Sequence, residues 1–393
     1  MKTLDLIVIG SGPAGSAAAR RALQLGLSVA IVDKATFPRD KLCGGLFTGR
    51  SEKAMRDIFG MDVTDTLFVT SDHMRFLAGG EVLADIKDAP PVHLTMRRDF
   101  DHLLHREALS AGAEPFLGQP VTEIGDSSIT LRDGTTLGYR CLIGADGVNS
   151  YVARHLFGKP FDPETIGFGL EIETPLDPNR DSAVEVDFDA AEWGYGWAFP
   201  KSNTVTVGVG GINSRNADMK GNMAAYVDLT GADPDLKYKG QYLPFGDYKR
   251  VPGRDHIVLV GDAAGLVDPI TGEGIALAME SGAMAAEAAH KAVTDGAPKT
   301  TFAHYLKAVK PIHKSLDQAR LWRMIMFPAA TQGYFKTAFA KGNALQMKYL
   351  ELLAGEVDYS DLRGALLRRL PKLAWRMLKH KIRPKIRSGR ASS

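Results

Sequence analysis

Near its start the chain carries residue types that can hold the phosphates of a dinucleotide. In residues 10–15 (GSGPAG), Gly10 permits a tight turn and Gly12 lets the backbone approach a pyrophosphate. Gly15 lets a helix pack closely on a strand, and Pro13 and Ala14 stand where that helix would begin. Free N–H groups and the dipole at a helix N-terminus favour anions, so this stretch predicts a pyrophosphate site.

The neighbours of these glycines match that chemistry. An apolar run at residues 6–9 leads into them, and residues 16–25 have a helical pattern. A second apolar run at residues 28–32 ends in Asp33, whose carboxylate suits a ribose hydroxyl and disfavours a 2′-phosphate. A glycine-rich turn that binds nothing is the alternative, but strand, turn, helix, strand and acid all coincide here.

Two later stretches have the same character. Residues 144–147 (GADG) include Asp146 and Gly147, and Gly261 and Asp262 open a third stretch (GDAA). Each stretch alone is weak support for a site. Their order and spacing together predict one FAD site built from three separated segments, so the chain must leave the nucleotide-binding fold and return to it.

A different residue pattern predicts an apolar surface. Tyr195, Trp197 and Phe199 alternate along the chain, so on a strand they share one face and form a flat wall that suits an alkyl chain. An ordinary sheet core is the alternative. Gly208 and Gly210 remove side chains from one face of the next strand, which leaves space or permits the close approach of a ligand.

The elements that must position these residues predict an α/β fold. We expect a Rossmann-like FAD-binding domain that is interrupted by a β-sheet-rich substrate domain and followed by a helical C-terminal region. The expected boundaries are 1–70, 96–165 and 246–300 for the discontinuous FAD-binding domain, 71–95 and 166–245 for the substrate domain, and 301–393 for the helical region with its basic end.

Within these blocks the patterns predict particular elements. Residues 71–95 look like a β-meander with a turn at Gly79 and Gly80. Residues 100–111 and 275–292 have helical patterns, and Pro311 forces a kink or break in the helical region that follows.

Length and composition fit an enzyme with more than one domain. The 393 residues predict two or three domains, and the apolar and charged fractions are ordinary for a globular protein. Cys43 and Cys141 are the only cysteines, so we expect no disulfide framework and a reducing, cytoplasmic setting. The sequence shows no signal peptide, no apolar run of membrane-spanning length and no metal-ligand spacing among its histidines.

The basic charge gathers at the C-terminal end. From Arg363 onward there are eleven Lys or Arg residues and no Asp or Glu, so the rest of the chain is acidic. Residues 366–378 have an apolar helical arc opposite a basic one, with Trp375 at the polar side and Pro371 as a defect. We expect this end to dock on an anionic membrane, which would make the protein peripheral on the inner face. A helix packed on the body is the alternative, and nucleic-acid binding is disfavoured because no recognition motif accompanies the charge.

The order of motifs resembles the p-hydroxybenzoate hydroxylase-type flavoprotein fold over about residues 1–300. The resemblance implies that residues 144–150 lie beside the FAD and that Asp262 binds a ribityl hydroxyl. It also implies that Arg97, which precedes a predicted helix, contacts the cofactor. Beyond the glycines and acids named above, the expected FAD contacts are Lys34, Cys43, Gly44, Arg97, Val121, Gly272, Gly274 and Ile275.

A closer resemblance is to the geranylgeranyl reductase family within that fold. Residues 195–200 (YGWAFP), followed after seven residues by Gly208 and Gly210, are similar to the family's substrate-side pattern. Residues 261–275 are similar to its flavin-side pattern, and residues 41–45 (KLCGG) resemble its cysteine–glycine loop. The family reduces isolated carbon–carbon double bonds of prenyl chains with reduced FAD. Its members act on chlorophyll precursors, archaeal lipids and quinone side chains.

Physical chemistry says what such a reduction needs from these residues. A helix from Ile275, opened by Gly272 and Gly274, would stabilise a reduced, anionic flavin ring through its free N–H groups. An isolated alkene must lie roughly 3–3.5 Å from the hydride donor and must also receive a proton. Cys43 is the candidate donor, because a thiol in an apolar pocket keeps its proton, and a small buried hydrophobe is the alternative. Lys41, Arg39 and Lys201 are candidates for binding an anionic head group, against the commoner solvated lysine.

Two other functions remain open from the sequence. A flavin monooxygenase or halogenase has the same fold, but a halogenase would be expected to show Trp-x-Trp-x-Ile-Pro where this chain has Tyr195, Trp197, Phe199 and Pro200. A non-catalytic flavin-binding protein is the other. Electrons would come from NAD(P)H or reduced ferredoxin, and so from a nicotinamide that binds transiently or from an electron-donor protein, because the sequence has no second dinucleotide fingerprint.

Overall fold

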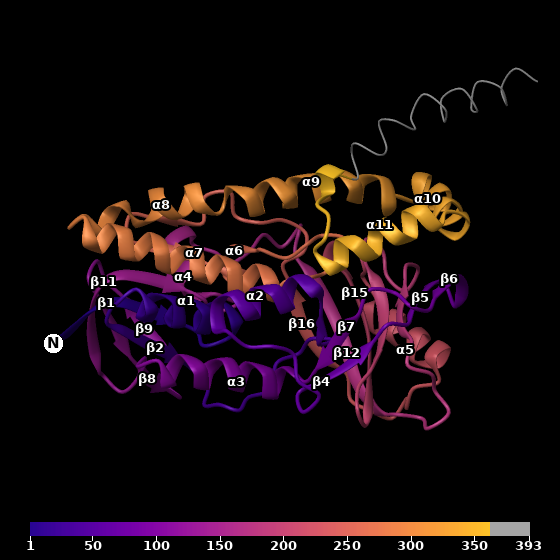
Figure 1. Cartoon of the computed structure of the whole chain (residues 1–393), viewed down its shortest axis with the longest axis horizontal. Helices are drawn as coiled ribbons and strands as arrows, with labels where there is room; N and C mark the ends of the chain where they lie inside the picture. Colours follow the sequence, from indigo (N-terminus) through magenta and orange to yellow (C-terminus); the bar gives the residue numbers. More distant parts are fainter. Residues whose placement is uncertain (362–393) are drawn as a thin grey trace, which may run out of the picture.

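The computed structural model describes residues 1–361, and the basic end with its apolar arc at 366–378 lies outside the described residues. Two larger sheets lie at opposite ends of the long axis, with helices above and below the first and a long helical layer over both (Figure 1). The helices are α1 (Pro13–Gln24), α2 (Gly49–Phe59), α3 (Arg97–Ser110), α4 (Tyr151–Phe157), α5 (Met219–Thr230), α6 (Gly261–Ala264), α7 (Ile275–Thr294), α8 (Thr301–Ala308), α9 (Lys310–Met326), α10 (Ala329–Lys341) and α11 (Asn343–Ala354), with short 3-10 turns η1 (Asn213–Arg215) and η2 (Pro298–Thr300).

The first sheet has eight strands and is mostly parallel. Its main path runs β17-β18-β11-β1-β2-β8, and β9 and β10 continue from β11 by antiparallel pairing. The strands are β1 (Lys2–Ile9), β2 (Val29–Asp33), β8 (Glu114–Leu117), β9 (Val121–Ile124), β10 (Ser128–Leu131), β11 (Thr136–Gly144), β17 (Gly253–Arg254) and β18 (Ile257–Leu259). The prediction of an α/β fold with a Rossmann-like part is confirmed.

The register of this sheet brings the three glycine-rich motifs together. Ile9 pairs with Gly144 on β11, and Gly144 pairs with Leu259 on β18, all in parallel strands. Each motif begins where its strand ends, so all three lie at the same carboxyl edge of the sheet, where ligands of open α/β sheets bind.

Small residues let the helices approach this edge closely. The α1 and α7 faces that meet are rich in alanine, and a Cβ on Gly282 would lie 2.1 Å from the carbonyl oxygen of Ala14. Only glycine therefore fits at position 282. The close contact fixes the first turn of α1 against the N-terminal half of α7.

The second sheet has seven strands in the order β16-β12-β15-β14-β13-β5-β6. The strands are β5 (Met74–Ala78), β6 (Glu81–Ile86), β12 (Gly167–Pro175), β13 (Val184–Asp187), β14 (Tyr195–Pro200), β15 (Thr204–Ile212) and β16 (Lys239–Leu243). One face packs against α5 through Met219, Met223, Tyr226 and Val227. Helix α5 lies inside a block that the sequence predicts as β-rich, although these four apolar residues have helical spacing that indicates it.

The predicted β-meander at 71–95 is wrong in its pairing. Strands β5 and β6 form a hairpin with its turn at Gly79 and Gly80, but β7 (Val92–Thr95) does not continue that hairpin. It pairs instead with β3 (Leu46–Phe47) and β4 (Phe68–Ser71) in a third, small sheet. The third sheet holds the end of the loop that precedes β3, because Thr95 donates its backbone N–H to the carbonyl oxygen of Gly45 at 3.0 Å. This loop lies against the aromatic strand β14, since a Cβ on Gly44 would lie 2.8 Å from the Phe199 ring.

The region after residue 300 is helical over the described residues, as predicted. Helix α8 ends at Ala308 and α9 begins at Lys310, with Pro311 in its first turn, so the proline marks a helix boundary. None of the helices within residues 1–361 combines the length and the apolar character that a membrane crossing requires.

Candidate functional site

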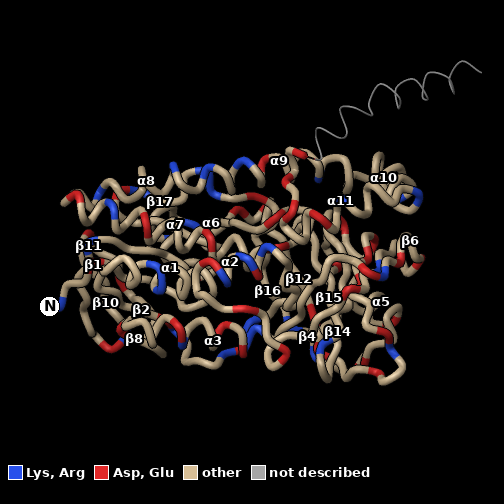
Figure 2. The backbone as a smooth tube through the Cα atoms, viewed as in Figure 1, with Lys and Arg blue, Asp and Glu red and all other residues tan. Residues whose placement is uncertain are grey.

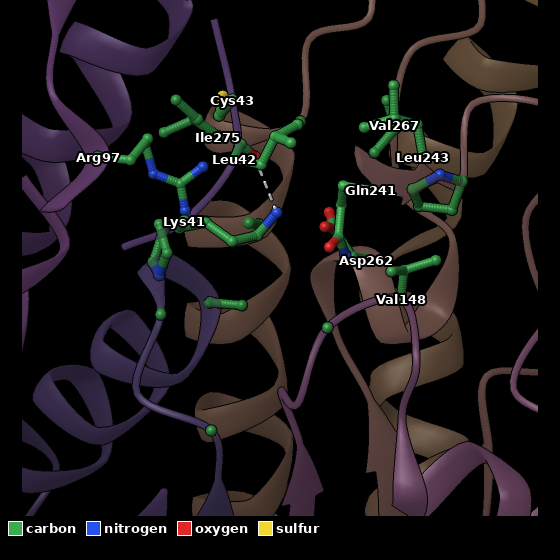
Figure 3. Close-up of a pocket in the computed structure, with 18 of the residues that line it drawn as sticks. Lys41, Leu42, Cys43, Arg97, Val148, Gln241, Leu243, Asp262, Val267 and Ile275 are labelled. Atoms are coloured by element: carbon green, nitrogen blue, oxygen red, sulfur yellow. Dashed lines mark hydrogen bonds between the residues drawn. The ribbon is translucent and has the colours of Figure 1, made fainter. Parts of the chain in front are cut away.

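One cavity of about 550 Å³ collects residues from both larger sheets. Its size is within the usual range for small-molecule and cofactor sites. Figure 3 shows Lys41, Leu42, Cys43 and Arg97 on one side of the close-up, and Val148, Gln241, Leu243 and Val267 on the other. The predicted FAD residues that line the cavity are Gly10, Gly12, Pro13, Ala14, Asp33, Lys34, Cys43, Gly44, Arg97, Val121, Asp146, Gly147, Asp262, Gly272, Gly274 and Ile275.

The glycines at the start of the chain have the geometry that their sequence predicts. Gly10 has φ of 100°, and a Cβ on it would lie 2.3 Å from the carbonyl oxygen of Ala145. A Cβ on Gly15 would lie 1.8 Å from the carbonyl oxygen of Gly10, so Gly15 permits the close packing of α1 on β1. Gly12 caps α1 and lines the cavity, and a Cβ on it would lie 3.4 Å from the Arg39 guanidinium. The free N–H groups of α1 therefore face the cavity.

Asp33 lies beside this loop at the end of β2. Its carboxylate is buried, and it accepts the backbone N–H of Ser11 at 2.8 Å and of Ala35 at 2.9 Å. These two bonds hold an anionic oxygen pair at the edge of the cavity. A ribose hydroxyl can donate to such an acceptor, which is the chemistry expected of this residue.

Two arginines share one buried carboxylate at the same end. Asp101 is fully buried, and its oxygens accept from Arg97 Nε at 2.7 Å and from the Arg39 guanidinium at 3.1 Å. Burial alone would lower the pKa of Arg97, but Asp101 and the side chain of Cys43 raise it above its ordinary value. Arg97 was identified from the sequence, but Asp101 was not. The four-residue spacing of the two residues on one helix could have indicated the ion pair between them.

Asp146 and Asp262 lie on neighbouring segments but differ in their contacts. The carboxylate of Asp146 accepts the Ser150 hydroxyl at 2.5 Å and the backbone N–H of Tyr151 at 2.6 Å, so it holds the N-terminus of α4. Burial raises the pKa of Asp146, and these hydrogen bonds oppose that shift. Asp262 lines the cavity at the first turn of α6 (Figure 3), and Gly261, with φ of 53°, provides the turn into that helix.

The loop before α7 contacts the aromatic strand β14 on one side and the N-terminus of α2 on the other. Gly272 has φ of 71°, and the Tyr195 hydroxyl donates to the carbonyl oxygen of Thr271 at 2.8 Å. Glu273 accepts hydrogen bonds from the Thr48 and Ser51 hydroxyls of the α2 N-terminus. Burial raises the pKa of Glu273 to about 7. Because this loop is held from both sides, the N-terminus of α7 at Ile275 is fixed facing the cavity.

The alternating aromatics line the cavity on one face of β14. The ring of Trp197 lies 6.0 Å from that of Tyr195 and 6.5 Å from that of Phe199, between centroids. The intervening Gly196 faces the other way, toward Tyr226 of α5. Burial raises the pKa of Tyr195 above its ordinary value, so its hydroxyl stays protonated at neutral pH.

The two glycines of β15 make room for this wall. A Cβ on Gly208 would lie 2.4 Å from the Trp197 indole, and a Cβ on Gly210 would lie 3.3 Å from it. The sequence suggests free space or a ligand beside these glycines. In the structure the Trp197 indole fills the space beside Gly208, and Gly210 also lines the cavity.

The cysteine–glycine loop covers the aromatic wall. Cys43 is half-buried, and its backbone N–H donates to Glu171 at 3.0 Å. Lys41 lines the cavity and donates to the carbonyl oxygen of Leu42 at 3.1 Å (Figure 3). Lys201 is buried and paired with Glu173 at 3.1 Å, so it does not serve the head-group role suggested for it.

These features fit FAD. The glycine loop at the N-terminus of α1 lines the cavity, Asp33 supplies an acceptor, and two arginines supply positive charge beside this loop. The α7 N-terminus and the aromatic wall face the same cavity, so a ring system and an apolar chain could lie side by side there. Within residues 1–361 no cluster of His, Cys, Asp and Glu has the arrangement of a metal site.

Comparison with known proteins gives a consistent result. A sequence model of the FAD dependent oxidoreductase family matches residues 5–106. The menaquinone reductase of Mycobacterium tuberculosis is 34% identical to this chain, and the match covers 72% of this chain and 76% of that protein. The geranylgeranyl diphosphate reductase of Rhodobacter capsulatus is 33% identical, with coverage of 75% and 77%.

Solved structures share the fold. A geranylgeranyl bacteriochlorophyll reductase-like protein from Thermoplasma acidophilum superposes with a TM-score of 0.71 at 22% identity, covering 90% of this chain and 92% of that one. A flavin-dependent brominase also has a TM-score of 0.71, at 20% identity, covering 94% of this chain and all of its own. The fold alone therefore does not separate reduction from halogenation.

Proposed function

This chain belongs to the geranylgeranyl reductase family of FAD-dependent oxidoreductases, and we propose that it hydrogenates carbon–carbon double bonds of a prenyl chain carried by a lipid, a quinone or a pigment precursor. The observation that carries the proposal is the wall of Tyr195, Trp197 and Phe199, which lines the same cavity as the α7 N-terminus and the glycine loop. Two relatives above 30% identity are named for reductions of prenyl or quinone compounds, which supports the same reaction class.

The residues of this chain have separable tasks in that reaction. Reduced FAD, when bound, supplies a hydride to one alkene carbon. The aromatic wall aligns an apolar chain and excludes water, and the hydrogen bond from Tyr195 to Thr271 fixes the wall relative to the α7 N-terminus. The free N–H groups at that N-terminus stabilise negative charge on a ring system placed against them. The second carbon needs a proton, for which Cys43 is the donor proposed from the sequence.

We propose NAD(P)H or reduced ferredoxin as the source of electrons. The described chain has one dinucleotide fingerprint, and its glycine loop already belongs to the FAD site. A nicotinamide would therefore bind transiently, and a ferredoxin would dock as a separate electron-donor protein.

We propose that the protein is cytoplasmic and touches the inner face of a membrane, because prenyl substrates partition there. The basic end of the sequence supports this, and so do several large apolar side chains exposed on α9 and α10, including Leu321, Met324, Ile325 and Tyr334. Figure 2 shows basic residues along α8 and α9 on the same side of the molecule. Binding to anionic liposomes that falls as salt rises would support this docking, and salt-independent or absent binding would overturn it.

The main experiment is anaerobic reoxidation of the reduced enzyme. Protein with FAD is reduced by dithionite and mixed with geranylgeranyl diphosphate or with a menaquinol, whose ring is already reduced so that only its prenyl chain can accept hydride, and the flavin absorbance is followed. We expect reoxidation without oxygen and a product heavier by steps of two hydrogens in mass spectrometry. A monooxygenase or halogenase would turn over only when oxygen is admitted, and that outcome would contradict the proposal.

A further inference from the structure

One carboxyl group in the cavity has an oxygen without a partner. Glu171 on β12 is 6% exposed, and its Oε1 accepts the backbone N–H of Cys43 at 3.0 Å. Its Oε2 is buried and has no hydrogen-bond partner. Buried polar atoms are normally hydrogen-bonded. An unpaired carboxyl oxygen in a ligand cavity therefore indicates that it contacts the ligand or takes part in the reaction.

The sheet register places this carboxyl group beside the aromatic wall. Glu171 pairs with Gly208 on β15, and Gly208 pairs with Trp197 on β14. Side chains directly opposite each other in antiparallel strands point to the same face. Because Gly208 has no side chain and the indole lies over it, Glu171 and Trp197 are neighbours on the face that lines the cavity.

A second polar atom, on Trp197, is also unpaired under the loop that carries Cys43 and Gly44. Gly44 lies against the indole, and a Cβ there would be 3.1 Å from Trp197 Nε1. That indole nitrogen is also buried without a partner. The unpaired Trp197 Nε1 and the unpaired Glu171 Oε2 thus belong to neighbouring side chains on the aromatic wall, where an alkyl chain is proposed to bind.

Two other polar groups of the cavity are already engaged. Glu273 accepts from Thr48 and Ser51, and the side chain of Cys43 lies close enough to Arg97 to raise the pKa of that guanidinium. Glu171 differs from these two because half of its hydrogen-bonding capacity is unused.

We propose that Glu171 is the acid that protonates the alkene, an assignment that rests on the proposed prenyl reduction. One alkene carbon accepts a hydride, with its electron pair, from the reduced flavin. The π electrons form the second C–H bond with the proton of Glu171 Oε2, which leaves a carboxylate. Water reprotonates that carboxylate, so each saturated double bond consumes one hydride and one proton.

The surroundings of Glu171 keep a large share of it protonated near neutral pH. Its pKa is raised to about 7, mainly by burial and to a smaller extent by the negative charge of Glu173. The Cys43 N–H and the positive charges of Lys201 and Lys41 act in the opposite direction. A general acid works best when its pKa lies near the working pH.

The kinetic test compares Glu171→Gln with a matched control. Glu123→Gln changes an exposed glutamate on β9, outside the cavity, and should leave reoxidation by geranylgeranyl diphosphate unchanged. Because general acid catalysis contributes about 10²–10⁴-fold, Glu171→Gln should slow that reoxidation at least about 100-fold. Reoxidation by ferricyanide, which needs no alkene protonation, should stay the same in both variants.

The pH profile separates an acid from a structural residue. The wild-type rate should fall as the pH rises through about 7, and Glu171→Gln should lose that dependence. Glu171→Asp keeps a carboxyl group on a shorter chain and should recover part of the rate together with the pH dependence. Cys43→Ala changes a residue of the cavity and is not a neutral control, but its rate should still fall as the pH rises through about 7, because Glu171 keeps its proton in that variant.

A readout independent of activity uses the protein without FAD. The folded-state pKa of Glu171 is raised, so its contribution to stability is full below about pH 4.5 and is lost as the pH rises through about 7. The melting temperature of Glu171→Gln relative to the wild type should therefore increase between pH 5 and pH 8. A constant difference would show that Glu171 has an ordinary pKa and would overturn the assignment.

The two levels of the proposal fail in different ways. If the wild type saturates the prenyl chain of neither geranylgeranyl diphosphate nor menaquinol, the proposed function fails and the role of Glu171 fails with it. If the wild type reduces either substrate while Glu171→Gln keeps its rate and pH profile, only the role of Glu171 fails, and loss of activity in Cys43→Ala would then identify the thiol as the donor.

Discussion

The nucleotide end and the aromatic end of the cavity are built by different means. The nucleotide end is formed mainly by backbone N–H groups and glycines, and each of its motifs consists of a few consecutive residues at the end of a strand. At the aromatic end, sheet register brings side chains of β12 and β14 together across the glycines of β15, and the loop at Cys43 packs over them. Local geometry therefore defines the first end, and long-range pairing defines the second.

This difference has consequences for tolerance to mutation. Gly10 and Gly15 of the glycine loop have no substitute, because a Cβ on either would meet backbone atoms that cannot move aside. A glycine that accommodates a side chain is less strict, since an aromatic ring can shift. We therefore expect the largest effects at the nucleotide end and smaller, more specific effects at the aromatic end.

Gly10→Ala should have the largest effect of the changes considered. Its φ of 100° is unfavourable for alanine, and the new methyl group would meet the carbonyl oxygen of Ala145 at 2.3 Å. We expect a loss of stability above about 4 kcal/mol, which is exceptional for one substitution, together with loss of FAD. Urea unfolding and flavin absorbance after gel filtration would measure both.

Gly26→Ala is the matched control for that change. Gly26 also has a positive φ, of 84°, but a Cβ there meets nothing within 4 Å. It should cost about 1–2 kcal/mol from backbone strain alone and leave FAD bound. Equal effects of the two variants would show that close packing at Gly10 is unimportant.

Asp101→Asn should have the next largest effect. The change removes the carboxylate shared by Arg97 and Arg39 and leaves their charges uncompensated at a buried site. Breaking a buried ion pair in this way costs about 3–5 kcal/mol. Asp99→Asn, on the exposed side of the same helix, is the control and should be nearly neutral. If FAD affinity measured by fluorescence quenching is the same in both variants, the arginine pair does not serve the cofactor.

The same contrast explains what the sequence could and could not predict. The sequence could predict that Gly10, Gly12, Asp33 and the glycine loop before α7 lie at one cavity, because strand, turn and helix are neighbours in the chain. The aromatic alternation of β14 was predictable for the same reason. The pairing of β7 was mispredicted, because proximity to the β5–β6 hairpin favoured a meander and tertiary contacts with β3 and β4 decided otherwise.

The residues that the sequence missed lie where distant segments meet. Glu171 has no local signal, because its importance depends on the loop at Cys43, 128 residues away in the sequence. Asp101 and Glu273 were overlooked because a single acid on a helix or in a loop is usually solvated. In the structure Asp101 is fully buried, and Glu273 is half-buried and held by Thr48 and Ser51 of a distant segment.

Glu273, at the junction of the two ends, gives a pH-dependent prediction. Burial raises its folded-state pKa to about 7 from 4.5, so the stability it contributes is present below pH 4.5 and is lost as the pH rises through 7. Relative to the wild type, Glu273→Gln should gain stability on the order of 3 kcal/mol between pH 5 and pH 8. Urea midpoints at several pH values would measure this, with the exposed Glu123→Gln as a flat control. A parallel pH dependence of Glu273→Gln and the wild type would contradict the assigned pKa.

The smallest and most specific effects should come from the glycines of β15. A methyl group on Gly208 would overlap the Trp197 indole at 2.4 Å, whereas one on Gly210 would meet it at 3.3 Å. Overpacking costs about 1–3 kcal/mol, so Gly208→Ala should displace the indole and slow reoxidation by a prenyl substrate, with FAD content unchanged. Gly210→Ala should have a weaker effect, even though Gly210 lines the cavity. The opposite order of the two rates in stopped-flow reoxidation would mean that the glycines make room for the ligand itself, and the aromatic wall would then not set the shape of this end of the cavity.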